Sequence, residues 1–181
     1  RKGVTVVKGE GVVDGGAVVV DGTRYEYDHL VVATGTEPAG LPGIDMDHPA
    51  VLTSNDVLVM PEVPESMIIL GAGVIGCEFA SLFQPLGVKV TMVEMLDRIM
   101  PVEDDDISKE ALKIFGKQGI DFKLGCMTKA VEKTASGADV RLVAGGAKVT
   151  IEDQATKKTE VIEAEQVIAA TQKAVGIDGD L

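Results

Sequence analysis

One stretch of the chain decides the fold, and it reads Met67-Ile68-Ile69-Leu70-Gly71-Ala72-Gly73-Val74-Ile75-Gly76. It opens with a short apolar run that is typical of a buried strand. The glycines that follow have the spacing GxGxxG, which joins a strand to a helix in dinucleotide-binding units. In such a unit the pyrophosphate accepts hydrogen bonds from N–H groups at the start of the helix. We therefore expect residues 71–76 to bind a pyrophosphate.

Each glycine of this turn has a separate expected task. Gly71 permits the tight turn after the strand, and Gly76 lets the helix pack closely. Gly73 leaves open the space that a side chain would fill, so that the pyrophosphate can approach the backbone.

Two acidic residues near this turn are candidate ligands. Glu94 lies 18 residues beyond Gly76, directly after an expected strand over residues 88–93. Its carboxylate can accept hydrogen bonds from the adenosine ribose and would repel a 2′-phosphate, which predicts NAD rather than NADP. The alternative is a solvated acid at a strand end. Glu78, in the first helical turn, either complements the helix dipole or faces the nicotinamide end of the ligand.

Downstream of the turn, the pattern predicts an α/β fold with a Rossmann-like βαβαβ unit. A helix is expected from Val74 to about residue 86, stopped by Gly87, and a second helix between residues 103–106 and Gly119. A three-stranded β-meander and one strand that returns to the sheet should follow. The remaining expected strands are residues 120–124, 139–143, 148–151, 160–162 and 167–170.

Upstream of the turn, the pattern predicts a short all-β segment. Apolar residues flank Asp14-Gly15-Gly16 as in a hairpin, and residues 30–33 read as a fully apolar strand. Five of the seven prolines fall within residues 36–66, which predicts a connector with only a brief helix around residues 54–58.

Composition narrows the classes of partner. The net charge of −12 disfavours binding of nucleic acid, and the Lys and Arg residues form no cluster in the sequence that would offset it. No apolar run reaches the roughly 20 residues needed to cross a membrane. The two cysteines, Cys77 and Cys126, are too far apart in sequence for a CxxC motif. We therefore expect no metal site and no redox pair, but two reduced, buried thiols in a cytoplasmic protein.

Two segments together resemble a known family. Residues 31–38, VVATGTEP, and residues 71–80, GAGVIGCEFA, are similar to motifs of the flavin- and NAD-dependent disulfide oxidoreductases. Residues 93–101, VEMLDRIMP, resemble the dihydrolipoamide dehydrogenases most closely. The resemblance covers nearly the whole chain.

The resemblance implies a piece of a larger flavoenzyme. Residues 1–40 would belong to an FAD domain, 41–66 to the connector, 67–171 to the NAD-binding domain, and 172–181 to the return segment. In that family a dithiol is oxidised through a redox disulfide and FAD, and hydride passes to NAD. The family's redox cysteines and catalytic His-Glu pair match no part of this sequence, so we expect no catalytic residue here. The parent would be a homodimer associated with a 2-oxo acid dehydrogenase complex, with a role in cell redox homeostasis.

The resemblance also implies particular contacts. It places Glu78 beside the nicotinamide and Val131 near the adenine. Its FAD contacts fall on Gly11, Thr34, Gly35 and Thr36. One departure is Gln172, which stands where the family has a glycine that approaches NAD, so that this contact is in question.

Two other interpretations stay open from the sequence. The chain could be a non-catalytic dinucleotide-binding or sensing module, because the acids and thiols described above suit no reaction by themselves. It could also be the NAD domain of another flavin disulfide reductase, such as a mercuric or glutathione-type enzyme.

Overall fold

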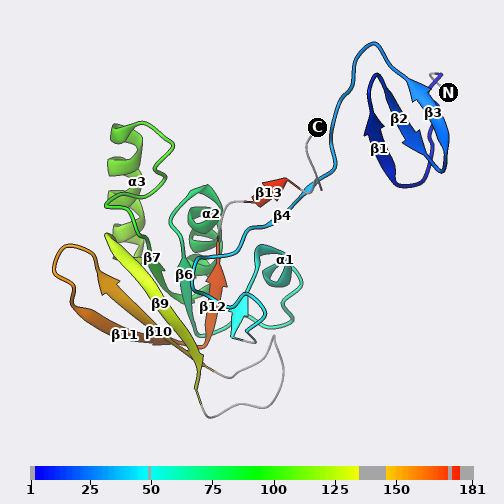
Figure 1. The fold of residues 1–181 in the computed structure, drawn as a ribbon. Coiled ribbons are helices and arrows are strands. Elements are labelled where there is room, and N and C mark those ends of the chain that lie inside the picture. Colours follow the sequence, from blue (N-terminus) through cyan, green and yellow to red (C-terminus); the bar gives the residue numbers. More distant parts are fainter. Residues whose placement is uncertain (1–2, 49, 135–145, 171–172, 176–181) are drawn as a thin grey trace. The chain divides into compact units, whose positions relative to one another are not determined.

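The computed structural model describes residues 3–48, 50–134, 146–170 and 173–175, and it divides the chain into two units. One unit is formed by Arg1–Glu37 with Val175–Leu181, and the other by Pro38–Ala174 (Figure 1). A two-stranded sheet of β4 (Thr36–Pro38) and β13 (Lys173–Val175) lies where the chain passes from one unit to the other. Each unit is therefore considered by itself.

The first unit contains an antiparallel sheet with the order β1-β2-β3. Its strands are β1 (Gly11–Asp14), β2 (Ala17–Val20) and β3 (Thr23–Glu26). Gly15 and Gly22 take the positive φ angles of 60° and 78° that such tight turns require. The hairpin expected around Asp14-Gly15-Gly16 is thereby confirmed, and Arg24 forms an ion pair with Asp14 across it.

The strand expected at residues 30–33 is absent, and that prediction was wrong. The segment has the apolar sequence of a strand but is not in a strand, and Val31 is 86% exposed. A strand exists only where a neighbouring strand exchanges backbone hydrogen bonds with it. Among the described residues none pairs with this segment, so its apolar composition alone does not make it a strand.

The second unit is built on a five-stranded parallel sheet, which confirms the Rossmann-like prediction. The order of its strands is β5-β12-β6-β7-β8. The chain runs from β6 outward through β7 to β8, and β12 returns on the other side of β6. The strands are β5 (Val51–Leu52), β6 (Ser66–Leu70), β7 (Lys89–Val93), β8 (Asp121–Lys123) and β12 (Gln166–Ala169).

The helices of this unit begin and end at recognisable residues. α1 (Ser54–Val57) starts with a capping box between Thr53 and Asp56. α2 (Val74–Phe83) follows the glycine turn, and α3 (Asp105–Gln118) ends at Gly119, which has a φ of 96°.

The expected helix from Val74 to about residue 86 is divided in two. α2 ends at Phe83, and the chain continues as the 3-10 turn η1 (Gln84–Leu86) before Gly87 stops it with a φ of 89°. Pro85 has no N–H to donate to the helical ladder, which explains the tighter final turn.

The meander consists of β9 (Cys126–Lys133), β10 (Ala147–Asp153) and β11 (Thr159–Ala164) in the order β11-β10-β9. The strand expected at residues 139–143 lies outside the described residues, and the first strand of the meander is β9 instead. β9 was not predicted, and its pairing with β10 is irregular, because the register shifts between Thr150 and Ile151 of β10. Such a bulge breaks the simple alternation of apolar and polar side chains.

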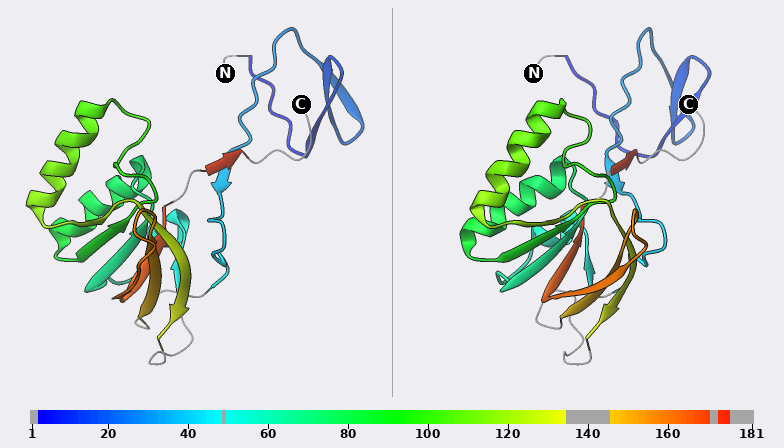
Figure 2. Two further views of the ribbon diagram at one scale, coloured as in Figure 1. Left: turned by 60° about the vertical axis from the view of Figure 1, so that its left-hand side comes forward. Right: turned by 90° about the vertical axis from the view of Figure 1, so that its left-hand side faces the viewer.

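The parallel sheet is covered on both faces (Figure 2). Met67 and Ile69 of β6 pack against the side that carries α2 and α3, and Ile68 and Leu70 pack against the meander. All four are at most 1% exposed. Successive side chains of a strand point to opposite faces, so a strand that is apolar throughout must be covered twice.

Both cysteines are free and buried, one in each layer, as expected. Burial, together with the nearby carboxylates of Glu94 and Glu78, raises the pKa of the Cys77 thiol to about 11. Within the described parts of the chain, no group of acidic, His and Cys side chains could hold a metal ion. No helix in those parts has the length and apolar character needed to cross a membrane.

The contact between α2 and the glycine turn yields a prediction about stability. A Cβ at Gly76 would lie 2.1 Å from the carbonyl oxygen of Gly71. The Gly76→Ala substitution should therefore lower the free energy of unfolding by about 3 kcal/mol or more, because backbone rather than a side chain must move. Urea denaturation followed by circular dichroism measures this.

Gly116→Ala is the matched control, because Gly116 also lies in a helix but a Cβ there would meet nothing within 4 Å. It should raise stability by roughly 0.5–1 kcal/mol through helix propensity. Equal effects of the two substitutions would contradict the close approach at Gly76.

Candidate dinucleotide-binding site

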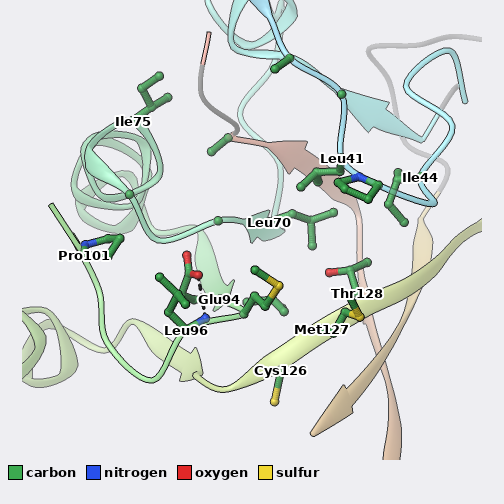
Figure 3. A pocket seen from close by; sticks show the side chains of 18 of the residues that line it. Leu41, Ile44, Leu70, Ile75, Glu94, Leu96, Pro101, Cys126, Met127 and Thr128 are labelled. Atoms are coloured by element: carbon green, nitrogen blue, oxygen red, sulfur yellow. Dashed lines mark hydrogen bonds between the residues drawn. The ribbon is translucent and has the colours of Figure 1, made fainter. Parts of the chain in front are cut away.

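A cavity of about 670 Å³ lies where three strands of the parallel sheet end (Figure 3). Leu70 and Val93 contribute the last residues of β6 and β7, and Ala170 follows β12. All the residues that line it belong to the second unit. The cavity thus lies at the carboxyl edge of the sheet, next to β6. From β6 the chain continues to β7 and β8 on one side, whereas β12 lies on the other side. Ligands of open α/β sheets bind at such a switch point.

The turn after β6 needs a glycine at its first position. Gly71 has a φ of 102°, and a Cβ there would lie 2.8 Å from the carbonyl oxygen of Ala170. The Gly71 N–H donates to the carbonyl of Val93 at 2.8 Å. The turn therefore starts between the ends of β7 and β12, with no room for a side chain.

Gly73 is different, because a Cβ added to it would meet nothing within 4 Å. It lines the cavity and is the N-cap of α2, with no side chain accepting hydrogen bonds from the helix start. The first backbone bond of the helix runs from Cys77 N–H to Gly73 C=O at 3.0 Å. The N–H groups of Val74, Ile75 and Gly76 thus have no acceptor within the helix.

Val74 and Ile75 also line the cavity, so the open end of α2 adjoins it. An uncapped helix start favours an anion through its free donors and its dipole. The space at Gly73 is the cradle that a side chain would fill. The residues present therefore fit a bound pyrophosphate.

The Glu94 carboxylate lines the same cavity, half-buried at the end of β7. One oxygen accepts a hydrogen bond from Ala72 N–H at 2.7 Å. The other accepts from Leu96 N–H at 2.9 Å, the bond that is dashed in Figure 3. A carboxylate has about four lone-pair positions, so two bonds leave capacity for ribose hydroxyls.

Among the described residues of the cavity wall, Glu94 is the one with a charged side chain, and most of the others are apolar. The described residues that line the cavity include no Lys or Arg, so these residues could bind a phosphate only through backbone N–H groups. A phosphate at the ribose 2′ position would find no cation there and would approach the Glu94 carboxylate. A net charge of −12 is therefore compatible with phosphate binding at this place, because the donors would be backbone N–H groups.

The structure places some of the expected site residues at the cavity and others away from it. Gly71, Gly73, Val74, Ile75 and Glu94 line the cavity, and the buried Ala72 and Gly76 lie directly behind it in the same turn and helix. This is the group that the glycine spacing and the strand-end acid predicted together.

Glu78 and Val131 do not line the cavity. Glu78 is exposed on α2, and Val131 packs against the meander-side core. The expected FAD contacts are exposed in the first unit: Gly11, Thr34, Gly35 and Thr36. Gln172 lies outside the described residues.

Several lining residues were missed from the sequence. The connector contributes Leu41 and Ile44, and β9 contributes Met127 and Thr128 (Figure 3). Met95 and Leu96 could have been found, because they directly follow Glu94 at the carboxyl end of a strand. The others come from segments whose placement depends on tertiary packing.

Comparisons with known proteins agree with this fold. The model of the pyridine nucleotide-disulphide oxidoreductase family matches residues 1–171. Dihydrolipoyl dehydrogenase 3 of Pseudomonas putida is 40% identical over 170 residues, which are 91% of this chain and 34% of that protein. The dihydrolipoyl dehydrogenase of Bacillus subtilis is 37% identical over 150 residues, covering 83% of this chain and 30% of its own length.

A solved structure shows the same fold. The HOCl-induced flavoprotein disulfide reductase RclA of Escherichia coli superposes with a TM-score of 0.71 at 23% identity. The alignment covers 95% of this chain and 37% of that protein. The chain thus spans about a third of the length of the relatives that it matches.

Enzymes of this family use FAD and NAD as cofactors. The matched range includes residues 1–37 of the first unit and all the residues that line the cavity of the second. On the strength of the family match and of these relatives, the chain belongs to the pyridine nucleotide-disulphide oxidoreductase family.

Proposed function

We propose that this chain is the NAD-binding portion of a dihydrolipoyl dehydrogenase. One observation carries the proposal: the uncapped start of α2, the open space at Gly73 and the Glu94 carboxylate converge on one cavity, whose described lining residues include no Lys or Arg. Dihydrolipoyl dehydrogenases among the relatives, at 37–40% identity, support the choice of enzyme.

The protein's task in this proposal is placement. The backbone at Val74–Gly76 would hold the pyrophosphate, and Glu94 would accept hydrogen bonds from the adenosine ribose. In the intact enzyme, FAD would take electrons from the dithiol substrate and NAD would take hydride from the flavin. The residues described here bind and orient the dinucleotide for that transfer, and none of them is proposed to be catalytic.

The finer assignments follow from the family. We propose residues 67–171 as the NAD domain and 1–40 as part of an FAD domain, with 41–66 as the connector and 172–181 as the return segment. Glu78 would lie beside the nicotinamide, and Val131 near the adenine. FAD would contact Gly11 and the turn 34–36 in the intact protein, which we propose to be a homodimer associated with a 2-oxo acid dehydrogenase complex.

The choice between NAD and NADP gives the first test of the site. Isothermal titration of the 181-residue chain should show that NADPH binds about tenfold or more weakly than NADH, because the 2′-phosphate meets Glu94 and no cation. Equal or tighter binding of NADPH would contradict the proposed role of Glu94.

Gly73 gives a second test that separates binding from folding. Because a Cβ at Gly73 meets nothing within 4 Å and its φ is −71°, Gly73→Ala should cost at most about 1 kcal/mol of stability. The added methyl group would occupy the place of the pyrophosphate, so affinity for NADH should fall more than about tenfold. Urea denaturation and NADH titration of the same sample measure both effects. Unchanged NADH affinity would show that the pyrophosphate does not lie against Gly73.

A further inference from the structure

The peptide groups on both sides of Ala72 are fixed by hydrogen bonds from outside the turn. The Ala72 N–H donates to Glu94 at 2.7 Å, and its carbonyl accepts from Met100 N–H at 2.7 Å. The Cys77 thiol donates weakly to the same carbonyl at 3.5 Å. Ala72 is fully buried, so water cannot replace Glu94 as the hydrogen-bond acceptor of its N–H group.

Glu94 and Met100, which make the two short bonds to Ala72, come from the segment after β7, and further hydrogen bonds hold this segment in place. Leu96 N–H bonds the second oxygen of Glu94 at 2.9 Å. Arg98 binds the carbonyls of Pro101 and Glu103 in the same loop and forms an ion pair with Asp105. Met100, whose N–H reaches the turn, takes an unusual φ of 44°. The loop thus supports the glycine turn rather than merely following the strand.

We infer that Glu94 is a positioning residue for the pyrophosphate turn as well as a ligand of the ribose. This inference rests on the proposed function and extends it. Ala72 stands between Gly71, where the chain turns, and Gly73, where the phosphate would approach. A carboxylate that holds the Ala72 N–H fixes the direction of the backbone at Gly73 before any ligand arrives.

Glu94 therefore couples two parts of the site through one side chain. Its contact with Ala72 acts on the pyrophosphate, and its free lone pairs act on the ribose. Replacement of Glu94 should therefore weaken binding of the pyrophosphate as well as binding of the ribose. This weakening should also be seen with a ligand whose adenosine ribose lacks hydroxyl groups.

A protein–ligand cycle separates the two roles. Dissociation constants are measured by calorimetry for the wild-type chain and Glu94→Ala, each with NADH and with an NADH analogue that carries 2′,3′-dideoxyadenosine. If Glu94 acts on the turn, Glu94→Ala should weaken binding of the dideoxy analogue by about tenfold. Equal affinities of the two proteins for the analogue, within about twofold, would overturn the inference.

The free protein gives a readout that does not depend on ligand binding. Amide hydrogen exchange at Ala72 should be at least about tenfold faster in Glu94→Ala than in the wild type, and exchange at Ile69 in the centre of β6 should not change. If Glu94→Ala fails to fold, Glu94→Met serves instead, since its side chain has a similar length and its thioether is only a weak hydrogen-bond acceptor. Unchanged exchange at Ala72 in these variants would overturn the inference.

Asp97→Ala is the matched control, because Asp97 is an exposed acid in the loop just after β7 and does not line the cavity. It should leave exchange at Ala72 unchanged. If the wild type bound neither NADH nor the analogue, the proposed function would fail, and the exchange result would still decide whether Glu94 holds the turn.

Discussion

The structure depends on one close approach between the backbone at Gly76 and the carbonyl group of Gly71. A Cβ atom on Gly76 would lie only 2.1 Å from the Gly71 carbonyl oxygen. This approach brings the start of α2 directly over the end of β6. The free N–H groups of the helix then point to the carboxyl edge of the sheet, between the ends of β7 and β12. This contact helps to fix the position of the cavity, because the three strand ends and the helix start form one part of its wall.

In the proposed site, backbone N–H groups at the start of α2 would take the place of basic side chains. This explains why an acidic chain of net charge −12 can belong to a family that uses NAD and FAD. Glu94, the one charged side chain among the described residues of the cavity wall, accepts hydrogen bonds from Ala72 N–H of the turn and from Leu96 N–H of the loop after β7. In the proposed complex the same carboxylate would also accept hydrogen bonds from the ribose, so that it would act on both the turn and the ribose.

The sequence predicts those parts of the fold that local chemistry decides. The strand, the glycine turn, α2 and the ends at Gly87 and Gly119 all follow from residues near one another in the chain. Parts that depend on distant partners were missed. Residues 30–33 have the composition of a strand but no neighbour to pair with, and β9 is hidden by a bulge. The apolar walls from Leu41 and Met127 are known only once the sheet and meander are packed together.

The central claim is that a dinucleotide binds at the start of α2, and amide chemical shifts measured during titration with NADH test it most directly. The account predicts the largest shifts at Val74, Ile75, Gly76 and Glu94, with saturation at a defined NADH concentration. Unchanged shifts at these amides, or the largest changes on a surface away from the carboxyl edge of the sheet, would contradict the account.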